Sequence, residues 1–201
     1  MGFLSFFVAS WIGRIIGLLL SLVILAVAFF GIIGVLAATG GPGACTPGGG
    51  PITVSDANAA AFQTKWDAFA GTLNNGQPAT VTFNESEVSS RANQWARDES
   101  IDFDADILVC IHDGSGEATA TFGGGWVDSE VSVTGTVTIE GTHPQAHVDD
   151  IELGNVPGFM IGPFEGRIED AIQEALDMID LDEHTYTVTL TEGSAQIDGT
   201  P

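Results

Sequence analysis

The sequence predicts an α+β fold: an N-terminal transmembrane helix, then a curved antiparallel sheet of about six or seven strands packed against two or three helices. Three observations predict it. A long apolar run opens the chain, apolar residues recur at helical spacing in three stretches, and alternating apolar and polar residues fill much of the C-terminal half. The 201 residues divide into a membrane anchor (1–38), a Gly/Pro-rich tether (39–51) and an acidic extracytoplasmic domain (52–201).

The predicted anchor is the uninterrupted run of apolar and small residues at 15–38. At about 1.5 Å per residue, such a helix reaches roughly 36 Å and crosses a hydrocarbon core of about 30 Å. Arg14 lies at its N-terminal edge, and no acidic residue precedes Cys45. The positive-inside rule then leaves the N-terminus in the cytoplasm and the domain outside, in a single-pass arrangement at the cell membrane.

Two other readings of the N-terminal region stay open. A cleaved signal peptide normally has an apolar region of only about 7–15 residues, although 35–37 (Val-Leu-Ala) has the composition of a cleavage site. Lipid modification of Cys45 is the other, but Pro42 stands where a lipobox has an aliphatic residue. The tether 39–51 that follows, rich in Gly and Pro, is typical of a flexible linker.

The chain has two cysteines, Cys45 and Cys110. An extracytoplasmic location permits a disulfide between them, and the sequence leaves the pairing open. Their spacing is not CxxC, so neither a redox motif nor a cysteine zinc site is indicated.

Three helices are expected. Ser55 can cap the first, 56–72, and Asn84 with Glu87 forms a capping box at the start of the second, which runs to about residue 97. Pro163 occupies a favoured first position of the third. The apolar face of the first helix consists of Phe62, Trp66, Phe69 and Leu73.

Strands are expected at 79–83, in a hairpin around the turn at 113–116, and in a final hairpin around 192–194. The longest strand, 127–140, has valines and Ile139 on one face and Asp, Glu, Ser and Thr on the other. The returning strand, 145–154, changes the parity of its apolar residues at Asp149 and Asp150, which predicts a bulge there.

Charge excludes one class of partner. All 27 acidic residues and four of the five basic ones follow Cys45, so this part of the chain has a net charge of −23. Nucleic acid is not expected as a partner, because phosphate binding needs a basic surface. The acidity and the single lysine suit a saline environment or bound divalent cations.

No catalytic, metal or cofactor site is predicted. The run Asp102, Asp104, Asp106 resembles the start of a calcium loop, but the Gly and Glu required later in that loop are absent. The four histidines are scattered, and the acidic residues around Asp150 do not form a pair across a cleft.

From Val81 onward the element order resembles a known family. The segments VTFNESEVSSRANQWA, ILVCIHDGSGEATATF, EVSVTGTVTIEG and DDIELGNVPGF lead into a long helix and a last hairpin. This order resembles the membrane-anchored bacterial domains of the YpmS type, related to tubular lipid-binding (BPI-like) proteins, in which an LG-x-(L/V)-P turn recurs. Leu153, Gly154, Val156 and Pro157 match that turn. The resemblance covers about 81–199; the helix at 56–72 and the acidity depart from it.

The resemblance implies a twisted sheet wrapped around a long helix, enclosing an apolar groove. Small inward-facing residues such as Ala118 and Gly135 would leave room for an acyl chain, or would let a helix approach closely. The residues expected to line the groove are Phe122, Val133, Val137, Phe159, Met160 and Phe164.

We therefore expect a non-enzymatic, membrane-tethered domain that binds a lipid or another apolar ligand. Two alternatives remain open: a cell-surface interaction or structural module without a ligand, and an acidic domain that binds divalent cations. The sequence leaves the ligand, the protein partner and the oligomeric state undetermined.

Overall fold

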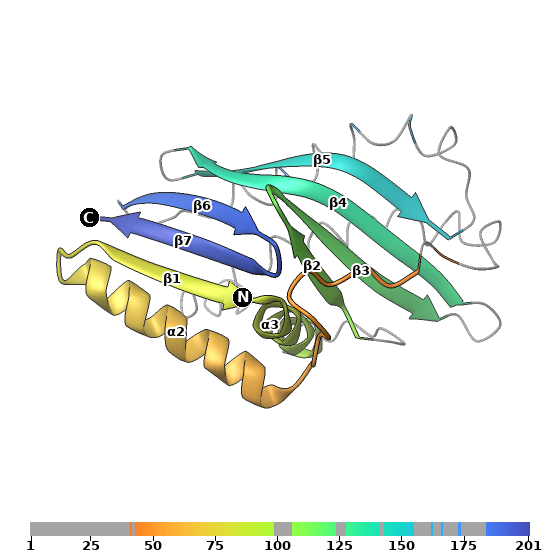
Figure 1. Cartoon of the computed structure of the whole chain (residues 1–201), viewed down its shortest axis with the longest axis horizontal. Helices are drawn as coiled ribbons and strands as arrows, with labels where there is room; N and C mark the ends of the chain where they lie inside the picture. Colours follow the sequence, from red (N-terminus) through yellow and green to blue (C-terminus); the bar gives the residue numbers. More distant parts are fainter. Residues whose placement is uncertain are drawn as a thin grey trace, which may run out of the picture.

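The computed structural model describes residues 41, 43–98, 106–123, 128–140, 143–154, 162, 166, 173 and 184–201. They form an α+β domain in which all strand pairs are antiparallel (Figure 1). The predicted anchor at 15–38 lies outside these residues. Within the described part, no helix is both long and apolar enough to cross a bilayer.

The seven strands form two sheets, where the sequence predicted one curved sheet. The three-stranded sheet has the order β1–β7–β6, with β1 at Ala79–Asn84, β6 at Thr185–Thr191 and β7 at Ser194–Thr200. The four-stranded sheet has the order β2–β3–β4–β5, with β2 at Leu108–His112, β3 at Ser115–Gly123, β4 at Asp128–Glu140 and β5 at His143–Leu153.

Two helices precede and follow β1. Helix α2 spans Asp56–Asn74, and the Oγ of Ser55 accepts a hydrogen bond from the N–H of Asn58, as the predicted cap requires. Helix α3 spans Glu85–Asp98 and begins with the predicted capping box: Asn84 Oδ1 accepts from Glu87 N (2.9 Å) and Glu87 Oε2 accepts from Asn84 N (3.1 Å).

One hydrophobic core joins both sheets and both helices. The predicted apolar face of α2 is buried, and Phe62 stacks on Phe83 of β1 with ring centroids 4.0 Å apart. A Cβ at Gly199 of β7 would lie 2.7 Å from Leu73 and 2.8 Å from Phe69, so the missing side chain lets α2 approach the sheet closely.

The long strand and its partner agree with the sequence in detail. Val131 and Val133 of β4 are buried. The register with β5 steps from Thr134–Asp150 to Gly135–Val148, which leaves Asp149 unpaired and confirms the predicted bulge. Of the predicted third helix, only Gly162, Gly166 and Gln173 lie among the described residues, and all three have helical backbone.

Candidate functional site

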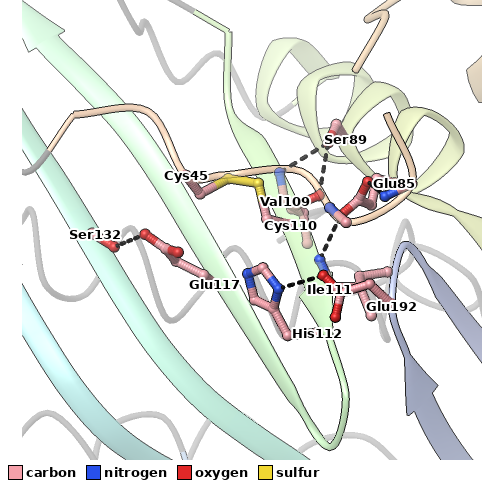
Figure 2. The surroundings of a disulfide bond; sticks show 12 residues. Cys45, Glu85, Ser89, Val109, Cys110, Ile111, His112, Glu117, Ser132 and Glu192 are labelled. Atoms are coloured by element: carbon pink, nitrogen blue, oxygen red, sulfur yellow. Dashed lines mark hydrogen bonds and ion pairs between the residues drawn. A yellow bond between two sulfur atoms is a disulfide. The ribbon is translucent and has the colours of Figure 1, made fainter. Parts of the chain in front are cut away.

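The segment 43–51, which we call the strap, is bound to the surface of the domain (Figure 2). The N–H of Gly43 donates to Glu130 Oε2 on β4, with N and O 3.1 Å apart. Cys45 forms a disulfide with Cys110 of β2, with Cα atoms 6.0 Å apart. Because the two cysteines are 65 residues apart, the bond lowers the entropy of the unfolded chain enough to stabilise the fold by about 4 kcal/mol.

A buried carboxylate holds the next part of the strap. Glu85, at the start of α3, is only 3% exposed. Its Oε1 accepts from the N–H groups of Gly48 (2.9 Å) and Ile111 (2.8 Å), and its Oε2 accepts from Gly49 (2.9 Å). One side chain therefore joins the strap, helix α3 and strand β2.

Gly48 and Gly49 have no side chain, which lets the strap pack against the backbone at Gly193. A Cβ at Gly48 would lie 2.7 Å from the backbone nitrogen of Gly193, and one at Gly49 would lie 3.1 Å from the Cα of Gly193. The sequence interpretation of 39–51 as a flexible tether therefore does not hold from Gly43 onward. The composition indicated flexibility, whereas here the missing side chains allow two backbones to pack.

Helix α3 binds the edge of the four-stranded sheet through side chains four residues apart. Glu85 pairs with Ile111, Ser89 accepts from Val109 N (2.9 Å), and Asn93 accepts from Ile107 N (2.9 Å) and donates to Ile107 O (2.7 Å). Four helical residues rise about 6.0 Å and two strand residues about 6.6 Å, so the two spacings nearly match.

The chain between the strap and α2 binds α3 with the same spacing of four residues. Thr53 N donates to Ser86 Oγ (2.9 Å) and Ser55 N donates to Ser90 Oγ (3.0 Å). Sequence analysis missed these roles, because the only polar residues of this helix that it considered were those of the capping box at its start. Short polar residues recurring at every fourth position were the available signal.

The predicted groove residues are only partly within the described region. Val133 and Val137 line a small cavity on the inner face of the four-stranded sheet, at the point where Gly116 and Gly135 are directly paired. Its volume, about 20 Å³, is close to that of a single water. The backbone of Phe122 belongs to β3, while Phe159, Met160 and Phe164 lie outside the described residues.

The small residues that the sequence placed in the groove differ from one another in how much space surrounds them. Ala118 and Ala120 are already buried in the core. Gly135 lies beside the bulge, where an added Cβ would collide with the carbonyl oxygen of His147, so this glycine permits the strand geometry. At Gly116 the nearest atom to an added Cβ is the carbonyl oxygen of Cys110, 3.9 Å away, which is an ordinary van der Waals contact.

Among the described residues, no three His, Cys, Asp or Glu side chains are placed to hold a metal ion. Of the DxDxD run, only Asp106 is described. His112 Nδ1 lies 3.2 Å from Glu192 Oε1, in the contact between the two hairpin turns. Asp149, Asp150 and Glu152 are exposed on β5.

Two side chains have shifted pKa values. Burial lowers the pKa of the Arg91 guanidinium, and the negative charge of Asp98 opposes that shift. Hydrogen bonds from Thr80 and Gln196 lower the pKa of the Asp198 carboxyl. Neither Arg91 nor Asp198 lines the small cavity or contacts the strap in any described interaction. We therefore attribute both pKa shifts to the local packing and hydrogen bonds of these two side chains.

Comparison with known proteins adds no relative. No family model, curated protein or solved structure matches this chain.

Proposed function

We propose that this chain is a non-enzymatic domain held at the extracytoplasmic surface of a membrane, where it serves as an interaction or structural module. The disulfide between Cys45 and Cys110 carries this proposal. Disulfides persist in oxidising compartments and are rare in the cytosol. Both cysteines are buried, at 6% and 0% exposed, so the bond is an integral part of the fold.

The position of the disulfide supports the membrane anchor. Cys45 is only seven positions after the end of the apolar run at 38. A disulfide at this point makes the domain begin almost at the membrane surface, because seven residues span at most about 25 Å. The carboxylates of Glu85 and Glu130 accept hydrogen bonds from backbone N–H groups of the strap.

Protease treatment of intact cells tests this proposal. The full-length chain should remain in the membrane pellet after alkaline extraction, and added protease should remove the domain without cell lysis. A full-length product in the soluble fraction that keeps Met1 would contradict it, as would a domain cleaved only after lysis.

Binding of a lipid or another apolar ligand is a second candidate. The cavity over Gly116 and Gly135 favours it, because Val133 and Val137 both line this cavity. An acyl chain is far larger than about 20 Å³, so the ligand would have to enlarge this cavity when it binds.

Uptake of a fluorescent fatty acid by the full-length chain tests this candidate. Gly116→Val fills the cavity and should abolish uptake, while Gly71→Val, on α2 where nothing lies within 4 Å of an added Cβ, should not. Absence of uptake by the unmodified chain, or equal uptake by both variants, would remove lipid binding from consideration.

A further inference from the structure

The chain contains one Asn-x-Ser/Thr sequence, formed by Asn84, Glu85 and Ser86. The other five asparagines have neither Ser nor Thr two positions later. In a chain that reaches the outside of a membrane, Asn-x-Ser/Thr is the acceptor sequence for N-linked glycosylation, provided that the middle residue is not proline. Asn84 is the last residue of β1, and the other two residues begin α3 (Figure 1).

The Asn84 side chain is exposed, and its structural role uses only the oxygen of its amide group. Oδ1 accepts the hydrogen bond from Glu87 N that forms part of the capping box of α3. Within the described part of the chain, Nδ2 takes part in no hydrogen bond. An N-linked sugar replaces one hydrogen of Nδ2 and leaves Oδ1 in place, so the helix cap is compatible with glycosylation.

The surface beside Asn84 presents mainly hydroxyl and amide groups. Phe83 packs on Phe62 of α2, so Asn84, the next residue of the strand, lies on the opposite face of the three-stranded sheet. The cross-strand rows on this face are Asn84, Ser194 and Thr191, then Thr82, Gln196 and Thr189, then Thr80, Asp198 and Thr187. Asp198 is the one charged residue in these rows, so a neutral sugar can lie here without removing several carboxylates from water.

We propose that Asn84 is N-glycosylated on the extracytoplasmic side of the membrane. The proposal rests on the proposed function, because it requires the domain to lie outside the cytoplasm. It adds a modification site to the domain, which neither the anchor nor the disulfide requires.

The modification is a group transfer from a glycolipid of the same membrane, catalysed by a membrane transferase. Asn84 Nδ2 forms a bond to the anomeric carbon of a sugar carried on a polyprenyl phosphate. The bond between that carbon and the phosphate oxygen breaks, the lipid phosphate leaves with the bonding electrons, and Nδ2 loses one proton. No oxidant or reductant is needed.

The transfer should take place before the domain folds. In the folded chain, Glu85 is 3% exposed, and Ser86 Oγ accepts a hydrogen bond from Thr53 N at 2.9 Å. These contacts hold both residues that follow Asn84 against the rest of the domain, whereas the transferase must contact all three residues of the acceptor sequence. We therefore expect the sugar to be added as the chain emerges from the membrane.

Mass spectrometry of the full-length chain, isolated from the membranes of the cells that produce it, tests the proposal. Trypsin cuts after Lys65 and Arg91, so Asn84 lies in the peptide 66–91. We expect this peptide to carry a glycan, and the same peptide from Asn84→Asp to have the mass of the bare sequence. The substitution keeps the capping oxygen and removes the nitrogen that accepts the sugar.

A second pair of variants reads the same site should Asn84→Asp fail to accumulate. Ser86→Thr keeps the acceptor sequence and should keep the glycan, whereas Ser86→Ala removes the hydroxyl and should lose it. A glycan on peptide 66–91 that survives Asn84→Asp or Ser86→Ala would overturn the proposal, because the acceptor sequence at Asn84 would then not direct it.

The location of the domain separates this proposal from the proposed function. A bare peptide 66–91, from a chain whose domain is removed by protease added to intact cells, overturns the glycosylation and leaves the extracytoplasmic location standing. A domain that protease reaches only after lysis overturns both.

Discussion

At the residue scale, single side chains that serve several backbone groups hold this fold together. Glu85 accepts from three N–H groups that belong to the strap and to β2, and it is almost fully buried. A carboxylate is suited to this position because it is purely an acceptor with two oxygens, so all three donors find a lone pair.

Replacement of Glu85 by Gln should be strongly destabilising. The amide nitrogen of Gln would point donors at an N–H group that now has a carboxylate oxygen, so we expect the free energy of unfolding to fall by about 3 kcal/mol. Urea denaturation of the full-length chain in detergent measures it. Glu152→Gln, the same change at an exposed position, should alter stability little. Equal effects of the two substitutions would contradict this role.

The paired glycines Gly116 and Gly135 should respond in opposite directions to the same substitution. Gly135→Ala places a methyl group against the carbonyl oxygen of His147 and should cost about 1–3 kcal/mol. Gly116→Ala makes only an ordinary van der Waals contact, and should stabilise by about 0.4–1 kcal/mol because it restricts the unfolded chain. Thermal unfolding of both variants checks this difference, and a destabilised Gly116→Ala would contradict it.

At the element scale, sequence patterns predicted most elements but not all their partners. The capping box of Asn84 and Glu87, the apolar face of α2 and the bulge at Asp149 are local features, and each was readable because the interacting residues are close in sequence. The buried polar side of α3 was missed. Ser and Asn are usually exposed in proteins. Ser89 and Asn93 are buried here because they pack against β2, where backbone groups satisfy their hydrogen bonds, and this contact cannot be read from the sequence of the helix.

The side-chain ladder between α3 and β2 should be important for stability. Asn93→Ala leaves both polar groups of Ile107 without their partner and should lower the free energy of unfolding by about 2–3 kcal/mol. Gln94→Ala, the neighbouring residue, removes only a contact with Arg91 and should cost much less. Hydrogen exchange at Ile107 should accelerate in the first variant alone; unchanged exchange would contradict the ladder.

At the scale of the whole molecule, the division into two sheets could not be predicted from sequence patterns. Strand β1 pairs with β7, so that Thr80 lies beside Asp198, 118 residues later. Alternation of apolar residues identifies strands but does not select their partners, and the two sheets share one core. The binding of the strap to the domain could not be predicted either, because its partners Gly193 and Cys110 are far from it in the sequence.

The net charge should make the fold sensitive to salt. With −23 charges beyond Cys45, mutual repulsion destabilises the compact state, and added salt screens it. We expect the Tm of the full-length chain to rise steadily as NaCl is raised from about 0.05 to 1 M, where the Debye length falls to about 3 Å. Scanning calorimetry measures it. A Tm that stays constant or falls would show that the acidic groups do not oppose folding.

The central proposal is that the domain closed by the buried Cys45–Cys110 disulfide is held at a membrane, on the side away from the cytoplasm. The most direct test is labelling of the chain with polyethylene-glycol maleimide in a membrane fraction from cells quenched with acid and then denatured. The account predicts no added mass before reduction and two adducts, on Cys45 and Cys110, after reduction. Two adducts without reduction, or a chain missing from the membrane fraction, would contradict it.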